Sequence, residues 1–161
     1  MAHDLIYNFQ MSKVIILPTD TVYGLACLPK DRDALDKVKN QPSSKLVAYV
    51  YPKVSDVICL TDDAYVRMAI ESLLPGPFTV VFIARDGRTV GVRVPAHPLC
   101  QDLLVSLGGP LLLTSANMHG ERPAITFAEA SSIFPSLPGV DGGPCLYQRP
   151  SCIIDLTQIR K

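Results

Sequence analysis

Polar side chains that could bind a small ligand stand directly after two apolar runs of the sequence. Residues 18–24, Pro-Thr-Asp-Thr-Val-Tyr-Gly, follow the run at 14–17, and Thr-Ser-Ala-Asn at 114–117 follows three leucines. In an open α/β sheet the ligand crevice lies beyond the ends of the strands, so hydroxyl and amide groups there could hold a small polar molecule. The same groups could instead cap backbone N–H groups in a strand-to-helix turn, and the sequence leaves both interpretations open.

Three cationic residues could neutralise an anion at such a crevice. Lys39 and Lys45 flank the polar loop at 40–44 and could carry two cations to a phosphate, although most lysines of this kind are simply solvated. Arg93 lies inside the alternating apolar run at 89–94, where an arginine faces either solvent or a buried anion. The sequence leaves open, for each of these residues, whether it binds an anion or is simply solvated.

The common signatures of several other chemistries are missing. The sequence contains neither a Gly-x-x-x-x-Gly-Lys-Ser/Thr loop nor a Gly-x-Gly-x-x-Gly fingerprint after a strand. Its five cysteines include no Cys-x-x-Cys pair and its three histidines lie far apart, which predicts reduced thiols and no metal site. A serine hydrolase using Ser115 with His97 or His119 would need a Gly-x-Ser-x-Gly elbow, which is absent.

Alternating strands and helices must position these residues. Apolar or alternating runs predict six strands, at residues 14–17, 46–51, 78–84, 89–94, 110–114 and 152–156. Helical spacing of apolar residues predicts four helices, at residues 31–39, 62–74, 98–107 and 126–134. The Asp86-Gly87 pair between two strand runs indicates a hairpin, so the pattern predicts an α/β fold with a mixed sheet.

The composition is typical of one globular domain, which we expect to span residues 1–161. A chain of 161 residues can bury roughly 70% of its unfolded surface in one core. Fifteen basic and fifteen acidic side chains cancel, so no overall field attracts a polyanion. No apolar run approaches the roughly 20 residues that cross a bilayer, and no targeting segment is visible at the N-terminus. We therefore expect a cytoplasmic protein without membrane contact.

Five segments, taken in order, carry a resemblance to a known family. They are residues 18–25, 74–79, 90–95 with His97-Pro98, 109–117 and 150–156. Together they resemble the YrdC-like family of L-threonylcarbamoyladenylate synthases, with Cys152 in place of a threonine in the last segment. The resemblance implies the family fold, a single-domain, open, twisted mixed sheet with helices packed around it and a concave, positively charged ligand cavity.

The resemblance also implies an activity. The family joins L-threonine, bicarbonate and ATP into threonylcarbamoyl-adenylate and pyrophosphate, which makes its members nucleotidyltransferases. Other proteins, the tRNA threonylcarbamoyl transferases, then move the threonylcarbamoyl group to an adenosine of tRNA. ATP would be a substrate and not a resident cofactor, with Mg²⁺ expected on its triphosphate.

Site residues follow from the same resemblance. The threonine pocket would be formed by Thr19, Tyr23, Arg93, Ser115 and Ser151. The nucleotide would be bound by Lys39, Gln41, Asn117 and Arg160. Catalysis would depend on Lys39, Ser115 and Asn117. The physical requirement is that cations and hydrogen-bond donors offset the repulsion between two anionic reactants.

Residue 41 departs from the family pattern, because the Lys-x-Arg motif reads Lys39-Asn40-Gln41. Gln41 can donate hydrogen bonds but cannot offset phosphate charge, so Lys45 or Arg149 would have to compensate. The alternative hypothesis is therefore a catalytically weakened relative that binds nucleotide, tRNA or double-stranded RNA without turnover. For RNA, a basic strip could be formed by Lys30, Lys37, Lys39, Lys45 and Lys53.

Overall fold

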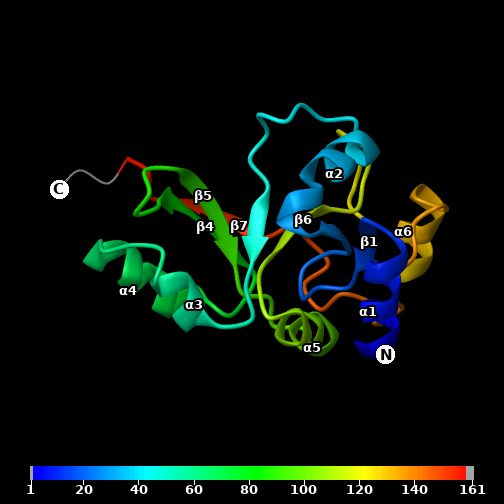
Figure 1. The fold of residues 1–161 in the computed structure, drawn as a ribbon, viewed down its shortest axis with the longest axis horizontal. Coiled ribbons are helices and arrows are strands. Elements are labelled where there is room, and N and C mark those ends of the chain that lie inside the picture. The colour runs from blue at the N-terminus through cyan, green and yellow to red at the C-terminus, as the bar shows by residue number, and fades with distance from the viewer. Residues whose placement is uncertain (1, 159–161) are drawn as a thin grey trace.

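The computed structural model describes residues 2–158, which form a layered α/β structure (Figure 1). The strands are β1 (Val14–Leu17), β2 (Gly24–Cys27), β3 (Ala48–Val50), β4 (Phe78–Ile83), β5 (Thr89–Arg93), β6 (Leu111–Ser115) and β7 (Cys152–Asp155). The helices are α1 (Ala2–Met11), α2 (Arg32–Lys39), α3 (Val54–Ile58), α4 (Ala64–Leu73), α5 (Pro98–Leu107) and α6 (Phe127–Ile133), with a 3-10 turn at Pro29–Asp31. None of the helices in this range is long and apolar enough to cross a bilayer.

All seven strands belong to one open sheet of mixed direction. Their order is β1-β2-β6-β3-β5-β4-β7. The β3–β5 and β4–β7 pairs are parallel and the other four pairs are antiparallel. The predicted fold class, an α/β domain with an open mixed sheet, is confirmed.

The helices cover the two faces of the sheet unequally. Val50 pairs with Leu111 on β6 and with Arg93 on β5, so these three side chains share one face. On that face Val50 and Leu111 pack against α1 and α5. Tyr49, one residue earlier, shares the opposite face, where α2 and α6 cover one end and α3 and α4 the other. The first face is consequently left uncovered along β4, β5 and β7.

Capping residues define one boundary of each of three helices. Asp63 accepts backbone N–H bonds from Tyr65 and Val66 at the start of α4, and Thr126 does the same for Glu129 in α6. Gly108 ends α5 in the left-handed conformation, with φ of 69°. These short polar side chains and this glycine fix the helix boundaries by satisfying backbone groups that the helices leave free.

Three elements were not expected from the sequence. The residues of β2 were expected to follow a strand-to-helix turn, but they form a fully buried strand between β1 and β6. This strand has only four residues and no alternating pattern, so its neighbours decide its conformation. The five residues of α3 are too few to show helical periodicity. In α1, Leu5 is the one fully buried side chain among residues 3–11, so the helix carries little apolar pattern.

A strap without regular structure, residues 135–151, runs from α6 to β7 and passes the outer edge of β1. The Ile16 N–H donates to the Pro138 carbonyl at 2.8 Å, and Gly139 bridges to Ile16. A Cβ atom at Gly139 would lie 2.7 Å from both the Cβ and the carbonyl oxygen of Ile16. Glycine therefore allows the strap to approach β1 closely and to protect this sheet edge.

We expect Gly139→Ala to lower the free energy of unfolding by about 1–3 kcal/mol, because the added methyl group overlaps backbone that cannot move freely. Gly109→Ala is the matched control, since a Cβ at Gly109 meets no atom within 4 Å. Urea unfolding monitored by circular dichroism measures both variants. Equal stability of the two variants would contradict the close approach of the strap to β1.

Candidate functional site

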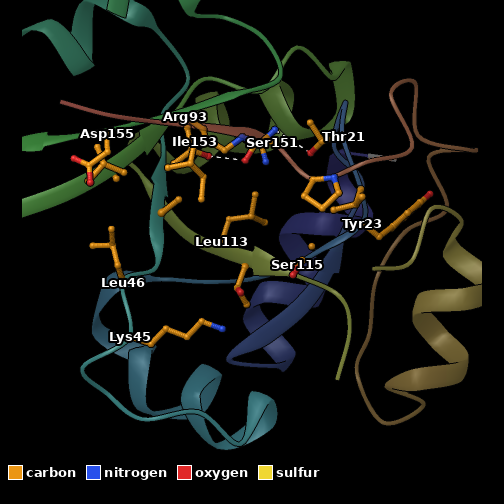
Figure 2. A pocket seen from close by; sticks show the side chains of 18 residues that line it. Thr21, Tyr23, Lys45, Leu46, Arg93, Leu113, Ser115, Ser151, Ile153 and Asp155 are labelled. Atoms are coloured by element: carbon orange, nitrogen blue, oxygen red, sulfur yellow. Dashed lines mark hydrogen bonds between the residues drawn. The ribbon is translucent and has the colours of Figure 1, made fainter. Parts of the chain in front are cut away.

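The uncovered part of the sheet forms a cavity of about 410 Å³ (Figure 2). Its floor consists of side chains two residues apart on four strands: Leu113 and Ser115, Gly91 and Arg93, Thr79 and Val81, Ile153 and Asp155. Residues two apart on a strand point to the same face, and the strand order and register place these pairs next to one another. The loop before β2 and the segment that leads into β3 complete the walls.

Arg93 is a buried cation in the wall of this cavity. Its side chain is 7% exposed, and its Nη2 donates to Asp20 Oδ1 at 2.9 Å and to Thr21 Oγ1 at 3.1 Å. Burial lowers the pKa of Arg93, and the charge of Asp20 opposes that shift. Because a guanidinium titrates so far above neutrality, Arg93 stays charged and Asp20 fixes its position.

Part of this ion pair lacks a hydrogen-bond partner. Asp20 Oδ2 and Arg93 Nε are buried and have no hydrogen-bond partner within the described part of the chain. His97 Nδ1 is likewise buried without a partner there, and burial lowers the pKa of His97. Most buried polar atoms in proteins are satisfied, so these unsatisfied atoms distinguish this ion pair from a fully bonded structural pair.

Hydroxyl groups occupy the cavity wall around Arg93. Ser115 Oγ donates to Asn117 Oδ1 at 2.6 Å, and the hydroxyls of Thr79 and Ser151 are 2.7 Å apart. Thr21 already bonds to Arg93. These groups give a partly apolar cavity a few fixed hydrogen-bonding positions, which is typical of small-molecule sites.

Lys39 bonds to the residues at the end of β6 from outside the cavity. Its Nζ donates to the carbonyl oxygens of Ser115 and Asn117 and to Asn117 Oδ1. The residue is only 4% exposed, and burial, followed by the charge of Lys45, lowers the pKa of the Lys39 ammonium from 10.5 to about 8. Lys39 thus holds the turn after β6 that presents Ser115 and Asn117.

Comparison with known proteins supports one family. The Sua5/YciO/YrdC family model, described as telomere recombination, matches residues 8–161. This chain belongs to the Sua5/YciO/YrdC family. A Mus musculus protein named threonylcarbamoyl-AMP synthase is 34% identical over 160 residues, which cover 91% of this chain and 57% of that protein. A Klebsiella pneumoniae protein of the same name is 37% identical over 159 residues, covering 88% and 84%.

The family also accounts for the fold. The crystal structure of P. abyssi Sua5 complexed with L-threonine has a TM-score of 0.81 at 22% identity, covering 96% of this chain and 49% of that one. This similarity shows a shared fold. The present chain spans somewhat over half the length of the mammalian relatives that it matches.

Within this Sua5/YciO/YrdC domain, the predicted site residues separate into three groups. Tyr23, Arg93, Ser115 and Ser151 line the cavity. Lys39 and Asn117 lie next to Ser115 and bond to it. The remaining three residues, Thr19, Gln41 and Arg160, do not reach the cavity or are not described.

Thr19 has a structural role in the turn before β2. Its hydroxyl donates to the Val22 carbonyl at 2.6 Å and is 3.1 Å from the Thr21 hydroxyl. The hydroxyl of Tyr23 points away from the cavity (Figure 2), donating to the Gly143 carbonyl at 2.8 Å. Burial raises the pKa of Tyr23 to about 12, so this phenol is neutral and ties the turn to the strap.

Gln41 lies in a separate surface depression with Asp36 and Ser43, and its Nε2 donates to Asp36 Oδ1 at 2.7 Å. Lys45, by contrast, lines the cavity. Arg160 lies outside the described residues. In the described part of the chain, no group of three or more His, Cys, Asp or Glu side chains is arranged to hold a metal ion.

Several residues in or next to the cavity were not selected from the sequence. Asp20 belongs to the same motif as Thr19 but its partner Arg93 is 73 positions away. Thr79 is two positions from Val81 on β4, and Asp155 is two positions from Ile153 on β7, and all four line the cavity. The two-residue repeat of a strand therefore predicts which side chains share a face with them. Their convergence could not be identified without the strand order.

The lowered pKa of Lys39 predicts a pH dependence of stability. Below pH 8 both folded and unfolded chains hold the proton, whereas between about 8 and 10.5 only the unfolded chain does. Unfolding then takes up a proton, so wild-type stability rises over this range by about 3 kcal/mol relative to Lys39→Met, which cannot titrate. Urea unfolding of both proteins from pH 7 to 10.5 measures the difference, and a constant difference would contradict a shifted Lys39.

Proposed function

We propose that this chain is a threonylcarbamoyl-AMP synthase, with residues 1–161 acting as one domain. The observation that carries the proposal is the buried Arg93 guanidinium, held by Asp20 in the wall of a cavity of ligand size. A guanidinium in such a place attracts a carboxylate through its charge and its N–H donors. The names of the curated relatives and the L-threonine complex of the structural neighbour Sua5 support this choice.

Threonine would bind with its carboxylate on Arg93. The hydroxyls of Ser115, Ser151 and Thr21 surround that position and would bond to the amino and hydroxyl groups of the substrate. This arrangement fixes the amine for reaction with bicarbonate, which gives N-carboxythreonine and water. Orientation of this kind converts encounters between separate molecules into a reaction within one complex.

The second half of the reaction would use ATP. An oxygen of the new N-carboxylate group attacks the α-phosphorus of ATP, the bond from that phosphorus to the oxygen bridging to the β-phosphate breaks, and pyrophosphate leaves. Both reactants are anions, so the reaction needs cations and donors at the point where they meet. Ser115 and Asn117 would present hydrogen-bonding groups at the end of β6, and Lys39, whose Nζ bonds to both residues, would add positive charge behind them. Gln41 is not included, because its amide donates to Asp36.

The triphosphate would bring Mg²⁺, held mainly by phosphate oxygens and water. Asp155 is the one carboxylate among the residues that line the cavity. The unstable adenylate would pass to a tRNA threonylcarbamoyl transferase, and we propose the cytoplasm as the compartment. The RNA-binding alternative is not favoured, since Lys39, one member of the supposed basic strip, is buried and bonded within the protein.

The decisive experiment is a search for the adenylate. Purified protein incubated with ATP, bicarbonate and labelled threonine should form threonylcarbamoyl-adenylate, which mass spectrometry detects. Pyrophosphate should be released only when threonine and bicarbonate are both present. Omitting each reactant in turn provides the controls. Salt-sensitive RNA binding without any adenylate would support the weakened relative instead.

Arg93→Lys tests the carboxylate site. Lysine keeps the charge beside Asp20 but loses the planar fork, so we expect the Kd for L-threonine to rise at least about tenfold. Arg93→Ala is less informative, because an unpaired buried Asp20 would cost about 3–5 kcal/mol of stability. Calorimetric titration with L-threonine and with threoninol, which lacks the carboxylate, measures the effect. Unchanged affinity for L-threonine would remove Arg93 from the site.

A further inference from the structure

His97 belongs to the third motif segment but lies outside the residues that line the cavity. It is the N-cap residue of α5, a position where a short polar side chain usually accepts a bond from the helix backbone. Its ring makes no such bond to the described helix. The ring instead contacts the strap, since a Cβ atom at Gly142 would lie 3.1 Å from His97 Cε1. The side chain therefore serves something other than the end of α5.

Gly142 links the His97 ring to the turn that carries Asp20. The same Cβ position lies 2.7 Å from Pro18 Cβ, so the backbone of the strap touches both the ring and the start of the turn. Arg93 stands only four positions before His97 in the chain and bonds to Asp20 at 2.9 Å. The strap, the turn and the end of β5 thus hold the imidazole close to the Arg93–Asp20 pair.

The imidazole and the carboxylate each keep one buried atom without a partner among the described residues, His97 Nδ1 and Asp20 Oδ2. Burial lowers the pKa of His97, while a hydrogen bond to the Gly142 backbone and the charge of Asp20 oppose that shift. The neutral ring is consequently the stable form of the protein alone at neutral pH. Any further negative charge close to the ring would favour its protonated form.

Four elements surround the ring and the ion pair. Their titratable and charged groups are Asp20 on the turn, Arg93 on β5, Cys100 on α5, and Asp141 and Cys145 on the strap. Burial raises the pKa of Cys100 to about 12 and that of Cys145 to about 11, so both thiols are neutral at pH 7. Asp141 accepts bonds from the Gly143 N–H and the Tyr23 hydroxyl. Beside these groups, an imidazole is the one that ordinarily changes its charge between pH 5.5 and 7.

We propose that His97 is a positioning residue of the carboxylate site, and that a carboxylate bound at Arg93 draws a proton onto its imidazole. The proposal rests on the proposed function, because it takes L-threonine as the ligand. The carboxylate adds a negative charge to a site in which Asp20 already offsets Arg93, and a protonated ring beside Asp20 balances that charge. Linkage requires the reverse effect as well, so protonation of His97 strengthens carboxylate binding by the same factor.

The first test measures L-threonine binding at pH 5.5 and pH 7, where the charges of the ligand itself do not change. It compares the wild-type protein with His97→Gln, which keeps a hydrogen-bond donor but cannot take up a proton. The matched control is His3→Gln, because His3 is exposed on α1. We expect the wild-type protein and His3→Gln to bind about threefold more tightly at pH 5.5, and His97→Gln to bind equally at both pH values. Threoninol, which lacks the carboxylate, should show no pH dependence with any of these proteins.

The second test follows the proton in the wild-type protein, so it does not depend on the folding of a His97 variant. The chain has three histidines, and His3→Gln and His119→Gln identify the His97 NMR resonance by elimination. Saturating L-threonine should move the midpoint of the His97 titration to higher pH. Calorimetry at pH 6 in two buffers with different heats of ionisation should show uptake of about 0.3 proton per bound L-threonine.

A titration midpoint of His97 that stays in place when L-threonine binds would overturn the proposal. Proton uptake that persists in His97→Gln would also overturn it, because the proton would then belong to another group. An equal loss of affinity at both pH values in His97→Gln, with wild-type affinity independent of pH, would assign His97 to the fold alone. Absence of L-threonine binding by the wild-type protein at both pH values would instead contradict the proposed function itself.

Discussion

The buried ion pair between Arg93 and Asp20 is the interaction on which the candidate site depends. Removing two charges from water is costly, and the pair is stable only if both partners are held in good geometry. The structure meets this requirement with two segments far apart in the sequence. Arg93 is fixed by the sheet as the last residue of β5, and Asp20 by the turn before β2.

That turn is rigid because it is bonded from several sides. Thr19 closes it internally, Tyr147 N–H donates to the Asp20 carbonyl, and the Tyr23 hydroxyl anchors it to the strap. Gly142 permits the strap to lie against Pro18, where a Cβ atom would come within 2.7 Å. Uncharged residues, the glycine of the strap and the neutral Tyr23, therefore help to keep the Arg93–Asp20 pair in place.

The cavity exists because the helices are distributed unequally. Four helices cover one face of the sheet, whereas α1 and α5 cover only one end of the other. The uncovered strands present Thr79 and Gly91 beside the apolar Val81 and Leu113, so the open face forms a hollow with a mixed polar and apolar lining. Two cationic residues, Arg93 and Lys45, line this hollow.

The sequence by itself determined the fold class, six of the seven strands, four of the helices and the motif segments that surround the cavity. These features are local, since they follow from periodicity, capping residues and turn formers within a few positions. The sequence also identified Arg93 as unusual, because a charged side chain inside an apolar strand must either reach solvent or be paired with an anion.

Tertiary structure alone decided which polar groups serve the site and which serve the fold. Thr19 and Ser151 are both short hydroxyl residues in motif segments, yet one closes a turn and the other lines the cavity. Gln41 and Lys45 occupy one loop, yet a carboxylate on the preceding helix draws only the first away. The reason is that a polar side chain bonds to the nearest suitable partner in space, and the strand order and helix packing that select this partner join residues distant in the chain.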